Sequence, residues 1–173
     1  KHRTDGNDLY CLQAITLISA NLERAIGNPG DIAARGAMLL GSCYAGIGID
    51  NCGTALAHNI SHAIADLAPI PHGRATGLAM LATIDWVAEG HPAAFARVAR
   101  AMSSVDAVSA YDRLVRATGI KISLEGDGLD LKDPELLARH MASPANNPMR
   151  KSTARYPSDE DLVMLAGRML SLQ

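Results

Sequence analysis

The sequence predicts an all-α fold, a helical bundle of about seven to eight helices in a single domain spanning residues 1–173. Hydrophobic residues make up 48% of the chain but aromatic residues only 3%, so small and flexible aliphatic side chains dominate the apolar fraction. Such a composition favours closely packed helices over a β-sandwich. Apolar residues also recur every three or four positions over long segments, which is typical of amphipathic helices. A chain of this length can bury a core of its own.

In the first third of the chain, this spacing predicts a helical hairpin. We expect one helix over residues 7–26, ended by Gly27, and a second that begins after the N-cap Asp31 and reaches Cys43. The short turn between them implies that the two helices pack antiparallel. Glycines then accumulate where neighbouring backbones are expected to come close, at Gly41, Gly46, Gly48 and Gly53.

The remaining helices are predicted from the same periodicity and from the positions of proline, glycine and capping residues. They span residues 54–67, 73–89, 93–102, 106–118 and 133–142, with a last helix capped by Ser158. Residues 121–131 and 143–157 are polar or rich in glycine and proline, which predicts surface loops.

The charge and cysteine patterns exclude several classes of function. The net charge of −2 is spread along the chain without a basic run, so nucleic acid is not an expected partner. The most apolar segment, residues 77–87, is interrupted by Asp85, and we therefore predict no membrane association. Three cysteines without a CxxC pair are interpreted as buried thiols of a cytoplasmic protein.

Three histidines form the strongest functional signal in the sequence. His58 and His62 are four residues apart, so both imidazoles leave the same face of a helix. Pro69 and Pro71 interrupt that helix, and a new one is expected to start near His72, whose ring can then turn back toward the first two. Isolated surface histidines remain the alternative. Gathered together, three imidazoles could bind a divalent ion or a reacting oxygen.

The residues around these histidines resemble the signature region of iron-containing (group III) alcohol dehydrogenases. The run from Asn51 to His62, followed by Ile70-Pro71-His72-Gly73, matches the family spacing of His, three residues, His, nine residues, His-Gly without a gap. The similarity extends more loosely to Gly119-Ile120 before Ser123-Leu124, and to Asn147-Pro148 before the last helix.

The resemblance implies a fold like the C-terminal domain of dehydroquinate synthase, and it implies roles for the three histidines. His58 and His72 would be metal ligands, and His62 would be the catalytic residue that lines the substrate pocket and relays a proton. The metal would be Fe(II), with zinc as the alternative, acting as a Lewis acid on the substrate oxygen. The whole protein would move a hydride between a small alcohol or aldehyde and NAD or NADP.

Other functions stay open at this point. The chain could belong to a glycerol dehydrogenase-like or maleylacetate reductase-like member of the superfamily, or it could be a non-catalytic helical binding module. Glycerol dehydrogenases and dehydroquinate synthases place their two ligand histidines further apart, which disfavours them. The upstream coding sequence would separate a dehydrogenase from a binding module.

The sequence also departs from the family pattern. Ala63 follows the middle histidine where the family usually has proline, and Asp66 one turn later either bonds to His62 or is a solvated acid at a helix end. The Asp and His that complete the family's metal site, and its nucleotide-binding domain, are missing from these 173 residues. We therefore expect the C-terminal part of a longer dehydrogenase, inactive by itself and prone to form homo-oligomers through exposed apolar surface.

Overall fold

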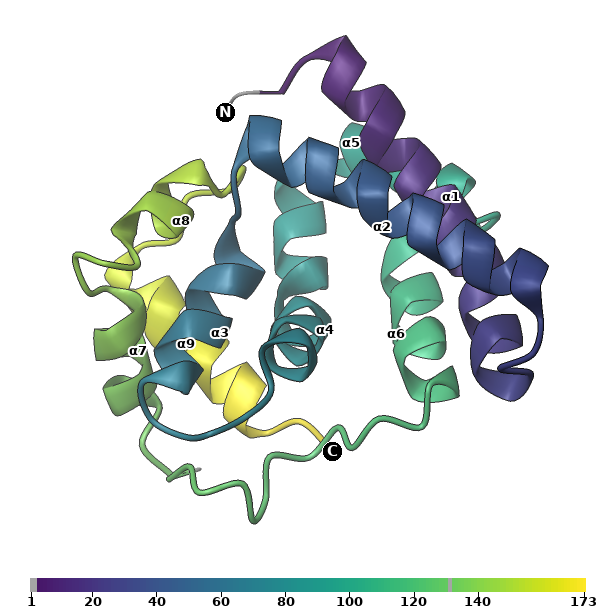
Figure 1. Ribbon diagram of the computed structural model, residues 1–173. Helices are drawn as coiled ribbons and strands as arrows, with labels where there is room; N and C mark the ends of the chain where they lie inside the picture. Colours follow the sequence, from purple (N-terminus) through teal and green to yellow (C-terminus); the bar gives the residue numbers. More distant parts are fainter. Residues whose placement is uncertain (1–2, 131) are drawn as a thin grey trace. The chain divides into compact units, whose positions relative to one another are not determined.

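The structure is a computed structural model that describes residues 3–130 and 132–173. In these ranges the chain forms nine α-helices and no strand, which confirms the all-α prediction (Figure 1). The helices are α1 (Asp5–Gly27), α2 (Ile32–Cys52), α3 (Leu56–Ala65), α4 (His72–Gly90), α5 (Pro92–Ala101), α6 (Ala107–Ala117), α7 (Pro134–Met141), α8 (Asn147–Ser152) and α9 (Asp159–Leu170).

Contacts within the backbone divide the described chain into two compact units. Residues 3–53 and 91–119, which carry α1, α2, α5 and α6, form the first unit. Residues 54–90, 120–130 and 132–173 form the second, with α3, α4, α7, α8 and α9. All three histidines of the predicted site therefore lie in the second unit.

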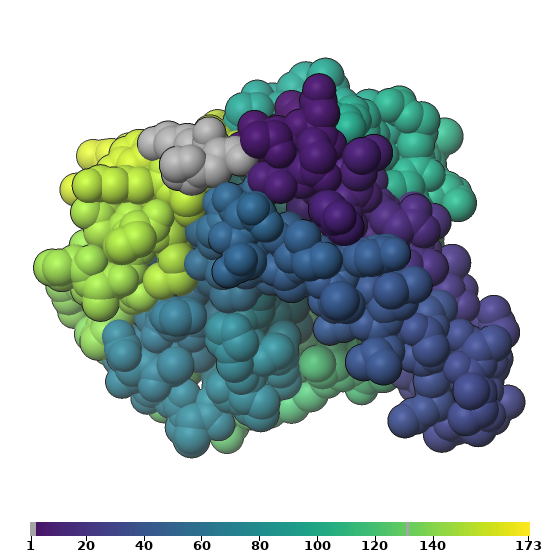
Figure 2. Space-filling view, turned by 45° about the horizontal axis from the view of Figure 1, so that its top comes forward, coloured from purple at the N-terminus to yellow at the C-terminus, as the bar shows by residue number. Residues whose placement is uncertain are grey.

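In the first unit, α1 and α2 form the predicted antiparallel hairpin and lie side by side (Figure 2). The Asp31 carboxylate accepts a hydrogen bond from the Ala34 amide at 2.9 Å, as expected of an N-cap. The second helix continues to Cys52 instead of ending near Cys43, and two of the glycines within it pack closely against α1. A Cβ at Gly41 would lie 2.8 Å from Cγ1 of Ile18, and a Cβ at Gly48 would lie 2.5 Å from Sγ of Cys11.

The other two glycines of this segment do not have the predicted role. No atom of a neighbouring element lies within 4 Å of a Cβ built at Gly46 or Gly53. Gly53 instead ends α2 with a φ of 76°, a conformation that side chains with a Cβ rarely adopt.

Helix α2 has an apolar surface that the sequence patterns did not single out. By length and composition alone it is long and apolar enough to cross a membrane, whereas from the sequence only residues 77–87 were considered for such a role. Core helices of globular proteins can be equally long and apolar, but they are mostly buried. In α2 only 17% of the most apolar 18-residue stretch is buried. Ile32 and Leu39 are 77% and 75% exposed.

The three cysteines of the first unit are free thiols, but they are less buried than predicted. Cys43 is exposed on α2, and Cys11 and Cys52 are half-buried. Burial raises the pKa of the Cys11 thiol, and the nearby Cys52 adds to this effect. The Asn7 side-chain amide donates to the Cys52 sulfur at 3.3 Å.

The second unit is built around α3, which buries most of its circumference, as its sequence predicted. The core consists of aliphatic side chains from α3, α4, α7 and α9, including Leu56, Ile60, Ile64, Leu78, Leu137, Met141, Leu162, Leu165 and Met169. One stripe of α3 stays open to solvent, and it carries His62, Ala65 and Asp66. The buried part of the helix therefore fixes the position of the open stripe.

The segment predicted as the surface loop 143–157 contains the short helix α8. Met149, Arg150 and Thr153 of this segment are buried. The Arg150 guanidinium donates to the Pro157 carbonyl oxygen through Nε at 3.0 Å and Nη2 at 2.8 Å, and it pairs with Asp159 at 2.8 Å. These contacts hold the segment against the core, and they were not visible in a polar, proline-rich sequence.

Candidate functional site

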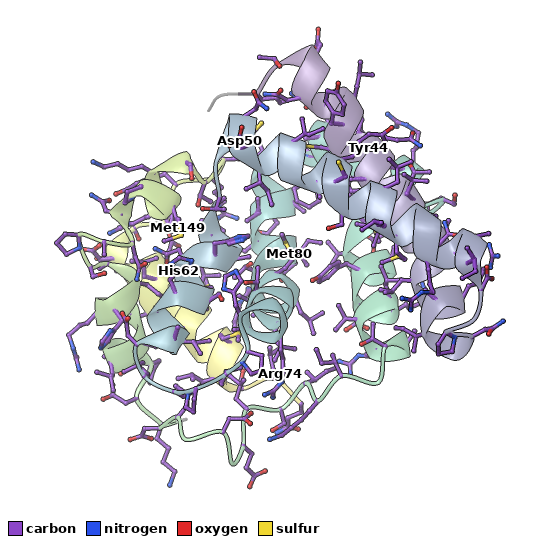
Figure 3. All side chains as sticks on the ribbon, in the orientation of Figure 1. Tyr44, Asp50, His62, Arg74, Met80 and Met149 are labelled. Atoms are coloured by element: carbon purple, nitrogen blue, oxygen red, sulfur yellow. The ribbon has the colours of Figure 1, made fainter. Side chains whose placement is uncertain are left out.

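The structure brings the three predicted histidines together on one side of the second unit. Ring centroids are separated by 5.4 Å for His58 and His72, 5.6 Å for His62 and His72, and 6.5 Å for His58 and His62. His58 and His62 project from α3, where Figure 3 labels His62, and His72 is the first residue of α4. The expected convergence of a helical pair and a following histidine is therefore present.

The turn between α3 and α4 produces this convergence. The helix ends at Ala65, and the Ala68 amide still donates to the Ile64 carbonyl at 2.9 Å. Ala68 and Ile70 are buried, while the intervening Pro69 faces solvent. The buried side chains hold the turn against the core, so that α4 starts with its first residue beside the open stripe of α3.

The three imidazoles differ in their surroundings. His58 is half-buried, whereas His62 and His72 are exposed. Burial lowers the pKa of His58, and the neighbouring rings of His72 and His62 lower it further because a second positive charge there is unfavourable. The lower pKa favours the neutral form of His58, which is the form that binds metal ions.

Two hydroxyl groups contact the His72 ring. Ser61 Oγ lies 3.1 Å from Nδ1, and Thr76 Oγ1 lies 3.5 Å from Nε2. Sequence reasoning missed Ser61, although one signal was available. A serine next to His62, inside an otherwise apolar stretch of helix, must find a partner for its buried hydroxyl.

Asp66 does not have the role considered for it beside His62. Its carboxylate oxygen Oδ2 lies 3.2 Å from Nδ1 of His140 on α7, and its side chain is 55% exposed. Asp66 forms the C-cap of α3, where the last turn directs its side chain toward α7. The alternative of a solvated acid near a helix end describes it better.

The fold and the site can now be compared with known proteins. A family model described as "Fe-containing alcohol dehydrogenase family, C-terminal" matches residues 2–167. The chain belongs to the iron-containing alcohol dehydrogenase family. The match covers nearly the whole chain and includes the three histidines, so this family's C-terminal domain accounts for both units.

Several known proteins are similar to this chain in sequence. A probable alcohol dehydrogenase EutG of Escherichia coli strain K12 is 30% identical over 122 residues, which are 68% of this chain and 31% of that protein. An NAD-dependent methanol dehydrogenase of Bacillus methanolicus is 28% identical over 151 residues, or 81% and 40%. A mitochondrial hydroxyacid-oxoacid transhydrogenase of Rattus norvegicus is 31% identical over 99 residues, or 50% and 21%. The chain thus spans less than half the length of these relatives.

Several solved structures show the same fold. A 1,3-propanediol oxidoreductase superposes with a TM-score of 0.85 at 22% identity, covering 98% of this chain and 46% of that one. An alcohol dehydrogenase from Oenococcus oeni gives 0.85 at 24% identity, covering 95% and 45%. Maleylacetate reductase from Agrobacterium tumefaciens gives 0.82 at 22% identity, covering 96% and 46%.

The family name implies iron, and the donor set of this chain fits part of a metal site. Two imidazoles that bind one ion at about 2.0–2.1 Å have ring centroids roughly 5 Å apart. His58 and His72, at 5.4 Å, have the shortest of the three separations and come close to that value. Within residues 3–130 and 132–173, however, no group of three or more His, Cys, Asp or Glu side chains could hold an ion together. The two rings are therefore suited to a shared site that other ligands complete.

Proposed function

We propose that this chain forms the metal-binding and substrate-binding part of an NAD(P)-dependent alcohol dehydrogenase or aldehyde reductase. In this proposal His58 and His72 are metal ligands, and His62 is the catalytic residue. The observation that carries it is the convergence of three imidazoles, with centroids 5.4–6.5 Å apart, in a chain of the iron-containing alcohol dehydrogenase family.

The proposed metal is Fe(II), with zinc as the alternative, and its contribution when bound is to polarise the substrate oxygen and stabilise the alkoxide. NAD or NADP, when bound, would supply the acceptor or donor of the hydride, and no residue of this chain is assigned to that cofactor. The chain's own part is to present neutral imidazoles. His58 is suited to this because burial disfavours its charged form.

In this mechanism His62 transfers the proton of the substrate hydroxyl group. Alcohol oxidation releases the hydroxyl proton of the substrate, and aldehyde reduction needs a proton for the product oxygen. The His62 imidazole is exposed and lies beside both proposed ligands, with its centroid 5.6 Å from that of His72. From this position it can pass a proton between the substrate oxygen and solvent.

The metal-binding step can be tested with the chain itself. Anaerobic titration with Fe(II), and separately with Zn²⁺, should show weak binding, because two imidazoles make an incomplete set of ligands. His58→Gln and His72→Gln should each abolish this binding. His62→Gln should retain it, since His62 is proposed to move a proton and not to ligate.

The matched control is His140→Gln, which removes an imidazole of the same unit that pairs with Asp66 outside the cluster. Equal metal binding by His58→Gln, His72→Gln and His140→Gln would refute the ligand assignment. The unmodified chain should also show no NAD(P)-dependent oxidation of simple alcohols, and clear turnover would show that its catalytic site is complete.

A further inference from the structure

Ser61 lies on α3, and its side chain contacts His72, the first residue of α4, twice. Its side chain is buried, with 1% of the residue exposed. The hydroxyl oxygen Oγ is 3.1 Å from Nδ1 of the His72 ring and 3.5 Å from the His72 backbone oxygen. Both of these contacts of the buried hydroxyl therefore go to one residue, His72, which is a proposed metal ligand.

The single hydroxyl proton limits how these contacts can be made. A carbonyl oxygen can only accept, so the contact with the His72 backbone oxygen requires Ser61 to donate. Ser61 Oγ must then accept from the ring, which places the ring proton on Nδ1. In a neutral imidazole the other nitrogen, Nε2, carries a lone pair and no proton. Thr76 Oγ1, 3.5 Å from Nε2, is able to donate toward that lone pair.

We infer that Ser61 is a positioning residue that holds the proton of neutral His72 on Nδ1 and so presents Nε2 as the metal-binding atom. The inference rests on the proposed function, because it takes His72 as a ligand. A histidine that ligates through one nitrogen usually donates from the other, and this hydrogen bond sets both tautomer and ring orientation. Here the acceptor is a buried hydroxyl in place of a carboxylate or a backbone carbonyl.

The position of His72 explains why such a partner matters. The residue is exposed and is the first of its helix, so the core does not enclose its ring. The tautomer of such an imidazole is decided by the hydrogen bond that the ring makes. Ser61, in contrast, lies on the buried side of α3, so its hydroxyl group has a fixed position from which it can contact the His72 ring.

The first test reads the tautomer directly. Nitrogen NMR of the chain labelled with ¹⁵N-histidine, recorded at about pH 8 so that histidines are neutral, distinguishes a protonated ring nitrogen from one with a free lone pair. The His72 signals are identified by their loss in His72→Gln. The unmodified chain should show a protonated Nδ1 and an unprotonated Nε2.

Ser61→Ala should move the His72 proton toward Nε2 or average the two nitrogen signals. Alanine favours the helix and occupies no more space, so the variant is expected to fold. The control is Thr83→Val, which removes another buried hydroxyl of the same unit. Thr83 donates to the Ala79 carbonyl at 2.7 Å, and it is 1% exposed. Its loss should leave the His72 signals unchanged.

The second test measures Zn²⁺ binding through the change it causes in the His72 Nε2 signal. Ser61→Ala should weaken binding about 10–100-fold, the usual cost of removing such a partner, while Thr83→Val should not.

The two tests separate the inference from the proposed function. A protonated Nε2 in the unmodified chain, or a tautomer and Zn²⁺ affinity unchanged in Ser61→Ala, would overturn the role of Ser61. A correct tautomer that depends on Ser61, together with a Zn²⁺ response that spares His72, would support the positioning role and overturn His72 as a ligand.

Discussion

The guanidinium of Arg74 and the carboxylate of Asp127 form an ion pair, with Nη2 and Oδ2 2.8 Å apart and both side chains largely shielded from solvent. Arg74 also donates to the carbonyl oxygens of Lys121 at 2.9 Å and Ser123 at 2.8 Å. Arg74, which is labelled in Figure 3, lies in the first turn of α4, the turn that begins with His72. Its contacts therefore connect the loop of residues 120–130 to this turn.

Arg74→Gln should therefore loosen this loop and destabilise the second unit. Glutamine cannot reach two carbonyl groups and a carboxylate at once, so at least one of these acceptors, two of which are partly buried, loses its donor. Trp86, the single tryptophan of the chain, is buried in this unit, and its fluorescence reports urea unfolding there. Arg168→Gln, which breaks a more exposed pair with Asp85, is the control and should cost only about 0.2–1 kcal/mol.

The same pair predicts a pH dependence. The hydrogen bond from Arg74 lowers the pKa of Asp127 from its usual 3.8, desolvation opposes the shift, and Lys121 adds to it. A carboxyl group whose pKa is lower in the folded state than in the unfolded state stabilises the protein at pH values above the unfolded-state pKa. This contribution disappears as the pH falls through the folded-state pKa. Asp127→Asn should thus be less stable than the unmodified chain above pH 3.8. The difference should shrink on further acidification, whereas parallel curves would contradict the prediction.

Asn59 is expected to stabilise the second unit through its side-chain amide. The residue is fully buried, and its nitrogen donates to the carbonyl oxygens of Met141 at 2.8 Å and Asn146 at 3.0 Å. Asn59→Ala leaves both acceptors without this donor, which should cost about 2–4 kcal/mol. The exposed Asn51, whose amide bonds to Ile47 within its own helix, provides a matched Asn→Ala change with an effect within about 0.5 kcal/mol. Urea unfolding followed by circular dichroism would compare both variants.

Gly41 and Gly46 offer a paired test of the α1–α2 hairpin. Gly41→Ala places a Cβ 2.8 Å from Ile18 Cγ1 and 3.3 Å from Leu17 Cβ, so the helices must separate, at a cost of about 1–3 kcal/mol. Gly46→Ala meets nothing within 4 Å and should instead stabilise the helix by about 0.5–1 kcal/mol. Hydrogen exchange of the α1 amides should become faster in Gly41→Ala only. Equal exchange rates in the two variants would show that the close approach at Gly41 does not contribute to stability.

The sequence was sufficient to predict the ends of helices where a proline or a capping residue determines them. Pro69 and Pro71 end one helix before His72, and this break made the convergence of the histidines predictable. Asp31 and Ser158 cap their helices as expected, and Ser158 forms a capping box with Asp161.

Features that depend on distant partners could not be predicted in this way. The anchoring of α8 through Arg150 requires the carbonyl of Pro157, and Asp66 turns toward His140, 74 residues away along the chain. The close packing at Gly41 and Gly48 of α2 involves Ile18 and Cys11 of α1, which are more than 20 residues away along the chain. Ser61 was overlooked for the same reason, since its importance lies in the ring of His72.

The division of the chain into interleaved units has a consequence for how the molecule can be made and cut. The backbone passes from one unit to the other after Gly53, again after Gly90 and a third time after Gly119. On the ribosome, the first unit cannot be completed until the stretch between Gly53 and Gly90 has already been synthesised. A protease cut between these two glycines would therefore divide both units between two fragments, and a truncation there would remove a part of each. Neither unit can be expressed as an uninterrupted segment.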